Sequence, residues 1–359
     1  MKRISTLDLV PGMVVADNVM TLDHQLVLAK DSVLTDALIT KLELYGVLFI
    51  YIDDSKPIPK PEPILKKELT HQEKVRSSIE FKVFKKKYEA ELDHFTKHMN
   101  AVVEKNAELD VMGLLRRPLQ LIAAAKGHIN ILDMLQNMRE FDDSTYLHCL
   151  NVALICNLFA KWLHMGDAEV ELATACGLFH DIGKILVPKD IITKPGKLTA
   201  DEFEEIKQHP LNSYNILREQ NVDEHIANAA LMHHERCDGS GYPLGVKGNQ
   251  ISGFAKMVAI ADVYDAMTSA RVYRGPLCPF KVIEMFEAEG LQRYDVAYVL
   301  PFLEHICDTY LQNGCRLSDG REGTIVMVNK QKLSRPVVKV GDEYINLAND
   351  PTLYIDCLL

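Results

Sequence analysis

His180-Asp181-Ile182-Gly183-Lys184 is the stretch that decides the fold, because two potential metal ligands stand side by side in a segment of helical hydrophobic pattern. A second pair, His233-His234, follows in the same segment, and Asp262 lies in an apolar run beyond it. Neutral imidazole and carboxylate together form a ligand set that zinc, iron, manganese and nickel accept, and one Asp can bridge two cations. Burying these groups without a counter-ion would be costly. The pattern therefore predicts a buried metal centre in a helical domain.

Three ordered motifs resemble the signatures of HD-GYP domains, a subgroup of the HD phosphohydrolase superfamily. Residues 180–184 are similar to the H-D-x-G-K signature of that family. The second signature resembles His233-His234-Glu235 followed by residues 238–243 (DGSGYP), and the third resembles residues 261–266 (ADVYDA). His148 and His209-Pro210 fall in the intervals that the family pattern expects. The resemblance covers about residues 120–300, a little over half of the chain.

The resemblance implies an HD-type all-helical catalytic domain that holds two divalent metal ions, iron or manganese, with nickel or zinc as alternatives. The metal ligands that it implies are His148, His180, Asp181, His209, His233, His234 and Asp262. Asp181 would bridge the two ions, with a water or hydroxide as the second bridge. Asp265 is expected to support a ligand instead of binding metal. Some family members bind a third ion through a Glu four residues before the first histidine; Ser144 stands there in this chain, so we expect two ions.

Cationic and aromatic side chains near these motifs are expected to contact a substrate. The resemblance gives catalytic roles to Asp181 and to Lys184, which would face substrate phosphate. Arg271-Val272-Tyr273-Arg274 matches the family's R-P-Y-R segment except at Val272, and its two arginines could grip a phosphate bidentately. Tyr242 is presented by a loop with two glycines. Structural alternatives exist for each: a solvated helix-end lysine, arginines paired with Asp265, and a loop that serves architecture alone.

The residues by themselves indicate hydrolysis of a phosphate ester at a dinuclear metal centre. The resemblance is more specific, since it implies a phosphodiesterase that uses a metal-activated hydroxide to open cyclic di-GMP, yielding the linear dinucleotide and then GMP. Two alternatives stay open. The substrate could be another cyclic dinucleotide such as cyclic GMP-AMP, or the chain could be a non-catalytic cyclic dinucleotide sensor or scaffold.

Composition along the chain predicts five segments. Residues 1–54 combine short β-like runs with one amphipathic helix, which indicates a small α+β accessory module. Residues 55–65 form a Pro-rich linker, because alternating prolines cannot join a helix or a sheet interior. A connecting helical segment follows at 66–118, and the metal-dependent phosphohydrolase domain at 119–313. Residues 316–359 form a short β meander, with strand-like runs at 323–328, 336–340 and 344–347.

One long helix is predicted within residues 66–110. Its apolar stripe consists of Tyr88, Leu92, Phe95, Met99 and Val102, at alternating steps of four and three residues. Such a stripe is typical of a helix that packs on the core of its own domain. The alternative is packing on a second copy of the chain, which would form a homodimer through residues 66–110.

Composition excludes several classes of protein. The chain has 359 residues, 47% of them hydrophobic, and a formal charge of −10 from 40 Lys and Arg against 50 Asp and Glu. This is a globular composition, and the acidic balance argues against a nucleic-acid partner. No apolar run approaches the ~18 residues of a membrane span, and the first residues lack a signal-peptide pattern. Eight scattered cysteines suggest reduced thiols. We therefore expect a cytoplasmic protein without a membrane partner.

Overall fold

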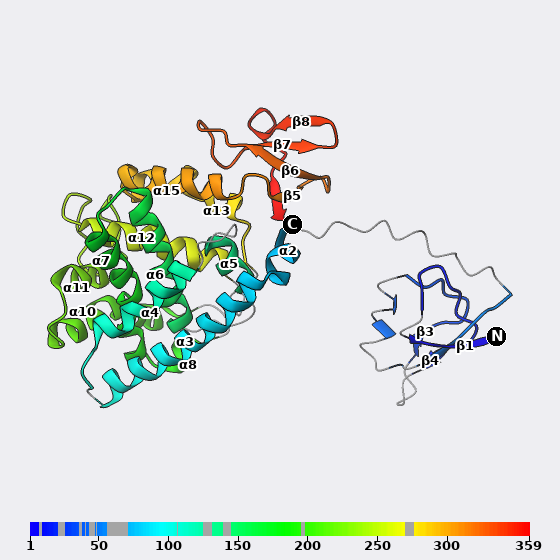
Figure 1. Cartoon of the computed structure of the whole chain (residues 1–359), viewed down its shortest axis with the longest axis horizontal. Helices are drawn as coiled ribbons and strands as arrows, with labels where there is room; N and C mark the ends of the chain where they lie inside the picture. Colours follow the sequence, from blue (N-terminus) through cyan, green and yellow to red (C-terminus); the bar gives the residue numbers. More distant parts are fainter. Residues whose placement is uncertain are drawn as a thin grey trace. The chain divides into compact units, whose positions relative to one another are not determined.

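The structure of the chain is a computed structural model (Figure 1). It describes residues 1–6, 9–20, 26–35, 38–39, 41–42, 47, 49–55, 71–105, 107–124, 131–138, 145–194, 198–269 and 276–359. The chain divides into two compact units, Met1–Glu68 and Leu69–Leu359. The expected fold class is confirmed, because a mainly helical body carries a C-terminal meander of strands and a small N-terminal module contains strands.

The N-terminal unit is built on two antiparallel strand pairs. Strand β1 (Lys2–Ser5) pairs with β4 (Phe49–Ile52), and β2 (Val19–Met20) pairs with β3 (Leu26–Leu28). Val15 joins them through a single bridge to Ile52, and both side chains are buried in a small separate core.

Four helices open the second unit. They are α2 (His71–Ser77), α3 (Ile79–Lys105), α4 (Val111–Ala124) and α5 (Ile131–Met138). The stripe predicted for residues 66–110 lies on α3, where Tyr88, Phe95, Met99 and Val102 are all buried. These side chains belong to the same hydrophobic core as the helices that follow. The apolar side of α3 is therefore occupied within its own unit.

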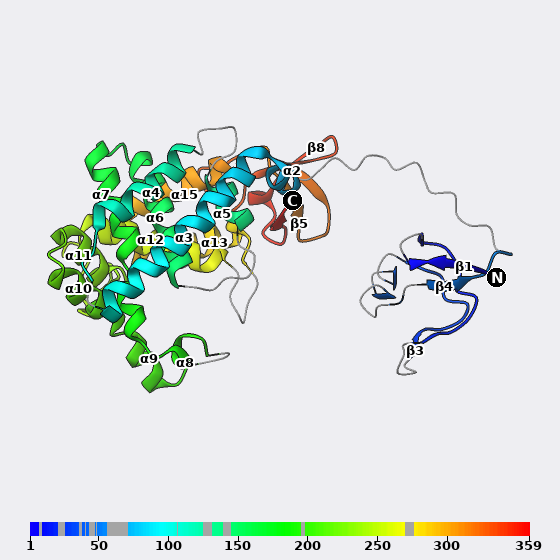
Figure 2. The same cartoon turned by 60° about the horizontal axis from the view of Figure 1, so that its bottom comes forward.

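The helical body surrounds two nearly all-apolar helices, α6 (Thr145–Trp162) and α12 (Gly253–Thr268). Helix α7 (Asp167–Phe179) packs closely on α6, because Gly177 has no side chain and a Cβ there would lie 2.9 Å from the backbone of Ala153. The remaining elements are the 3₁₀ turn η2 (Ile182–Leu186), α8 (Lys189–Ile192), α9 (Ala200–Ile206), α10 (His209–Glu219), α11 (Glu224–Met232), α13 (Pro279–Met285), the π-turn η3 (Phe286–Gly290), α14 (Leu291–Arg293) and α15 (Val296–Thr309). Figure 2 shows α8 and α9 projecting from this body.

The C-terminal strands form one antiparallel sheet in the order β8-β7-β6-β5-β9. The strands are β5 (Gly314–Leu317), β6 (Glu322–Met327), β7 (Val337–Val340), β8 (Glu343–Asn346) and β9 (Ile355–Leu358), with a 3₁₀ turn η4 (Leu347–Asn349) before β9. The sheet is tied to the helical body by buried Arg335, whose guanidinium lies 2.6 Å from Glu284. Among the described residues, no helix is both long and apolar enough to span a membrane.

Candidate metal centre

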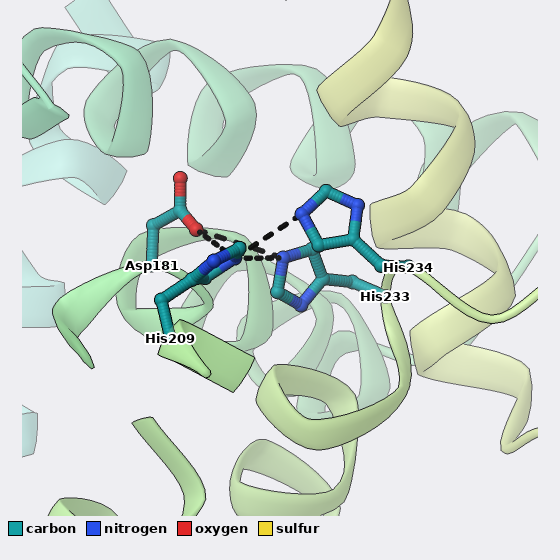
Figure 3. Close-up of side chains that lie close together, drawn as sticks. All are labelled: Asp181, His209, His233 and His234. Carbon is teal, nitrogen blue, oxygen red and sulfur yellow. Dashed lines mark hydrogen bonds and ion pairs between the residues drawn. The ribbon is translucent and has the colours of Figure 1, made fainter. Parts of the chain in front are cut away.

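The seven predicted ligands converge from five helices and their ends. His148 lies in α6, His180 and Asp181 directly follow α7, His209 begins α10, His233 and His234 follow α11, and Asp262 lies in α12. Their ligand atoms form two groups, within each of which the atoms lie within 4.8 Å of one another. One group is Asp181, His209, His233 and His234, and the other is His148, His180 and Asp262. In Figure 3, the three imidazoles of the first group face the Asp181 carboxylate.

In three of the histidines, the end of a helix determines which ring nitrogen carries a proton. In each, Nδ1 faces a backbone carbonyl three residues earlier, and because a carbonyl oxygen only accepts, this nitrogen must carry the proton. The Nδ1 to oxygen distances are 2.8 Å for His180 to Gly177, 2.6 Å for His209 to Ile206 and 2.8 Å for His233 to Ala230. With Nδ1 occupied in this way, Nε2 is the ring nitrogen available to bind a metal ion.

These Nε2 atoms meet each other and a carboxylate without any hydrogen-bond donor between them. Nε2 of His209 lies 3.3 Å from Nε2 of His233, and Oδ1 of Asp181 lies 3.2 Å and 3.6 Å from the two nitrogens. Two nitrogen ligands at about 2.1 Å from one ion lie about 3.0 to 3.4 Å apart in octahedral or tetrahedral geometry. The observed spacing fits a shared cation.

Unsatisfied buried atoms point to the same conclusion. Nε2 of His180 and Oδ1 of Asp181 are buried and have no hydrogen-bond partner within the described part of the chain. Both residues are fully buried. A buried acceptor without a partner costs about 1 to 3 kcal/mol, and more when it is charged. The residues present therefore fit a bound metal ion, which would satisfy both atoms.

His148 is held between two carboxylates. Its Nδ1 lies 2.8 Å from Oδ2 of Asp265, and its Nε2 lies 2.9 Å from Oδ1 of Asp262. Burial opposes the charge of this ring, but the hydrogen bonds to Asp262 and Asp265 outweigh it and raise the pKa of His148 to about 9. Asp265 does not belong to either ligand group. Its contact with Nδ1 is the one expected of a carboxylate that orients a candidate metal ligand.

Lys184 lies at the rim of the centre. Its Nζ is 2.5 Å from Oδ2 of Asp181, and its side chain is 25% exposed. Burial opposes ionisation of Asp181, but its close neighbours His180 and Lys184 outweigh burial and hold the pKa of this carboxyl well below its ordinary value. The ammonium group is thus close to the ligands, on a side chain that is partly exposed.

Tyr242 lies over the centre on a loop that a buried carboxylate organises. Its ring stacks on His234 with centroids 4.7 Å apart and an angle of 25° between the planes. Glu235 is 2% exposed and accepts backbone hydrogen bonds from three consecutive residues of this loop. The nitrogen to oxygen distances are 2.6 Å from Leu244, 3.2 Å from Gly245 and 3.1 Å from Val246. The role of Glu235 was not predicted from the sequence, although an acidic residue beside a glycine-rich loop was a usable signal.

A family model described as HD domain matches residues 120–298, which include all seven convergent ligands. These residues belong to the HD domain family. The expected superfamily is thereby confirmed, and the two ligand groups of the HD domain are candidate sites for divalent metal ions.

Curated relatives share sequence with parts of this chain. A cyclic di-GMP phosphodiesterase of Pseudomonas aeruginosa is 36% identical over 222 residues, which cover 62% of this chain and 53% of the relative. A cyclic di-GMP phosphodiesterase of Thermotoga maritima is 36% identical over 187 residues, covering 51% and 50%. A 3'3'-cGAMP-specific phosphodiesterase of Vibrio cholerae is 38% identical over 145 residues, covering 40% and 34%. The chain spans about half the length of the first two relatives.

Three predicted positions of the HD domain lie outside the described residues. They are Arg271 and Arg274, expected to bind phosphate, and Ser144, expected to replace the carboxylate of a third metal site. Their roles stay predictions.

Proposed function

We propose that this chain is a metal-dependent phosphodiesterase that hydrolyses cyclic di-GMP to the linear dinucleotide, to GMP, or to both. The observation that carries the proposal is the convergence of the Nε2 atoms of His209 and His233 on the buried Asp181 carboxylate. The names of the Pseudomonas aeruginosa and Thermotoga maritima relatives support the choice of substrate.

The proposed cofactors are two divalent ions, iron or manganese, with nickel or zinc as alternatives. They would be held by the seven convergent residues, with Asp181 shared between the two groups. When bound, such ions supply a lowered pKa for water and positive charge for the phosphoryl oxygens.

The side chains of the site have distinct proposed roles. His180, His209 and His233 orient their lone pairs through the backbone carbonyls that hold Nδ1. Lys184 binds a phosphate oxygen of the substrate, for which its ammonium group beside Asp181, on a partly exposed side chain, is suited. Tyr242 presents its ring next to His234, where a nucleotide entering the centre would meet it. Arg271 and Arg274 are proposed as additional phosphate contacts from their sequence alone.

Cyclic GMP-AMP is a second candidate substrate, favoured by the similarity to a relative that is named as specific for 3'3'-cGAMP. A non-catalytic sensor or scaffold is the third interpretation. It is disfavoured because every ligand position implied by the family pattern holds His or Asp.

We further propose that the chain acts in the cytoplasm, since all eight of its cysteines are free thiols. A homodimer through residues 66–110 also stays a proposal. Because the apolar side of α3 is buried within its own unit, such a dimer would use the polar side of this helix.

Elemental analysis of anaerobically purified protein, combined with chromatography of the products from cyclic di-GMP and cyclic GMP-AMP, tests the proposal. We expect about two metal ions per chain and faster conversion of cyclic di-GMP. Asp181→Ala should lose metal and activity while circular dichroism shows an intact helical domain, and Asp190→Ala, on exposed helix α8, is the matched control. Full metal content and activity in Asp181→Ala would refute the assignment. A metal-loaded wild type without product from either dinucleotide would favour a sensor.

A further inference from the structure

A cavity of about 640 Å³ lies between α3 and α4, and none of the metal ligands lines it. Four of its polar residues, Lys87, Glu91, His94 and His98, are spaced by four, three and four residues and so share one side of α3. Arg116 and Arg117 line it from α4. The volume is within the range of small-molecule sites, which is about 300 to 1,000 Å³. The cavity is therefore large enough for an organic ligand of nucleotide size.

The interior of this cavity contains an acceptor that lacks a donor. Glu91 is 3% exposed, and its Oε1 is buried without a hydrogen-bond partner in the described part of the chain. Its Oε2 lies at a long distance of 3.5 Å from the guanidinium of Arg117. Burial raises the pKa of Glu91 to about 7, despite the opposing charge of Arg117. A ligand that donates hydrogen bonds would supply what this carboxyl group lacks.

Two ring nitrogens beside Glu91 are unsatisfied as well. Nδ1 of His94 and Nε2 of His98 are buried and lack hydrogen-bond partners among the described residues. Their rings are inclined by 28° with centroids 6.2 Å apart. Burial, followed by the charge of Arg117, lowers the pKa of His94, so its ring is neutral near pH 7. Planar rings of this kind offer both hydrogen bonds and a flat surface to a bound base.

The mouth of the cavity is positively charged in an acidic protein. Lys87 and Arg116 are exposed, and neither has a carboxylate partner within the described ranges. Asp110 also lines the cavity, but its Oδ1 already accepts a hydrogen bond from the backbone of Gly113 at 2.8 Å. The chain as a whole has a formal charge of −10. Two unpaired cations at one mouth therefore favour an anionic ligand group.

We propose that this cavity is a second ligand site that binds a guanine nucleotide. The N1–H and N2–H₂ groups of guanine would donate to the Glu91 carboxylate, while the phosphate would bind Lys87 and Arg116. Adenine presents an acceptor where guanine presents N1–H, and this acceptor would face the carboxylate oxygens. The site thus selects for guanine over adenine. The proposal does not depend on the reaction at the metal centre.

A metal ion fits the cavity less well, although Glu91, His94 and His98 are all potential ligands. Among the described residues, the ligand groups gathered within 4.8 Å are those of the metal centre, and these three are not among them. Arg117 lies 3.5 Å from Glu91 and would repel a cation there. The charges around the cavity therefore favour a nucleotide over a metal ion.

Equilibrium dialysis with GMP, AMP, guanosine and zinc tests the proposal, using metal-loaded wild type and each variant as purified. Because GMP is also a proposed product, sites are counted in wild type, Asp181→Ala and Glu91→Gln. We expect Asp181→Ala to retain one GMP site. Glu91→Gln should lower the affinity of that site for GMP at least tenfold. AMP should bind the retained site at least tenfold more weakly than GMP. Arg116→Ala should weaken GMP but leave guanosine unchanged, which separates recognition of phosphate from that of base.

Glu89→Gln is the matched control, since Glu89 is exposed on α3 and does not line the cavity. Circular dichroism checks that each variant is folded. Because the Arg116 side chain is exposed, Arg116→Ala keeps the test valid if Glu91→Gln does not fold. Equal affinities for GMP and AMP would overturn the proposal, as would unchanged GMP binding in both Glu91→Gln and Arg116→Ala. Zinc that binds Asp181→Ala and is lost when Glu91→Gln is added to that variant would identify a metal site instead.

Discussion

The carboxylate of Asp265 lies 2.8 Å from Nδ1 of His148, on the side of the imidazole opposite to the candidate metal centre. The same carboxylate also accepts a hydrogen bond from the side-chain amide of buried Asn151, at 3.1 Å. These contacts fix the Asp265 side chain and, through it, the plane of the His148 ring. The remaining nitrogen of that ring, Nε2, points toward Asp262. Asp265 therefore determines the direction in which His148 can bind a metal ion.

We expect Asp265→Asn to lower metal affinity by about 10- to 100-fold while the chain stays folded, because the charge that orients His148 is lost but the shape is kept. Titration of the metal-free protein against a chelating indicator measures the change. Asp223→Asn is the matched control: Asp223 faces His225 at 2.9 Å on the exposed surface. Wild-type affinity in Asp265→Asn would show that the orienting carboxylate is dispensable.

Lys184→Ala should keep both metal ions but slow turnover of cyclic di-GMP. Losing a charge-assisted contact costs about 1.5 to 3 kcal/mol, hence roughly 10- to 100-fold in kcat if the contact forms in the transition state. Steady-state kinetics and elemental analysis of the same preparation provide both measurements, with Lys189→Ala on exposed helix α8 as the control. Loss of metal in Lys184→Ala would assign this lysine a structural role beside Asp181.

Glu235→Gln should raise the KM for cyclic di-GMP without lowering metal content. One oxygen that accepts backbone hydrogen bonds becomes an NH₂ group, so the loop of residues 238–248 loosens and Tyr242 leaves its stacked position. Limited proteolysis of this loop reports the loosening. Because Glu235 acts through Tyr242, the double variant with Tyr242→Ala should have the same KM as Tyr242→Ala alone. Additive effects of the two changes would contradict this positioning role.

The candidate metal ligands could be predicted because their chemistry is local in sequence. His180-Asp181 and His233-His234 are adjacent pairs of ligand types, and the family motif connects them with Asp262. Their orientation was not predictable, because it depends on the carbonyl groups at the ends of α7 and α11, and the ends of helices are poorly specified by sequence. The partner of Asp265 is likewise hidden, since His148 is 117 residues away along the chain.

Packing between distant segments limited the prediction of the fold. The runs 323–328, 336–340 and 344–347 correspond to β6, β7 and β8, which pair with their neighbours in sequence. Strand β9 was not predicted, because it pairs with β5 at the other side of the sheet, from the far end of the segment. The cavity between α3 and α4 was missed for a similar reason. A helical pattern places Glu91, His94 and His98 on one side of α3, but it does not say which helix covers them.

Glu91 should make the stability of the chain depend on pH in a direction opposite to that of most carboxyl groups. Its pKa is raised to about 7 in the folded chain, above the ordinary value of 4.5, because burial disfavours the charged form. The folded state then binds more protons than the unfolded state between these two values, so the contribution of Glu91 to the free energy of unfolding falls as pH rises from about 4.5 to 7.

Glu91→Gln has no such group. We therefore expect its melting temperature to match wild type near pH 4.5 and to exceed it increasingly up to pH 7, with a constant difference above. Thermal unfolding of nucleotide-free protein across this range measures the difference. The control is Glu89→Gln, whose free energy of unfolding should stay within about 0.5 kcal/mol of wild type throughout. A difference that shrinks with rising pH would show that the Glu91 carboxylate is stabilised, and not destabilised, by its surroundings.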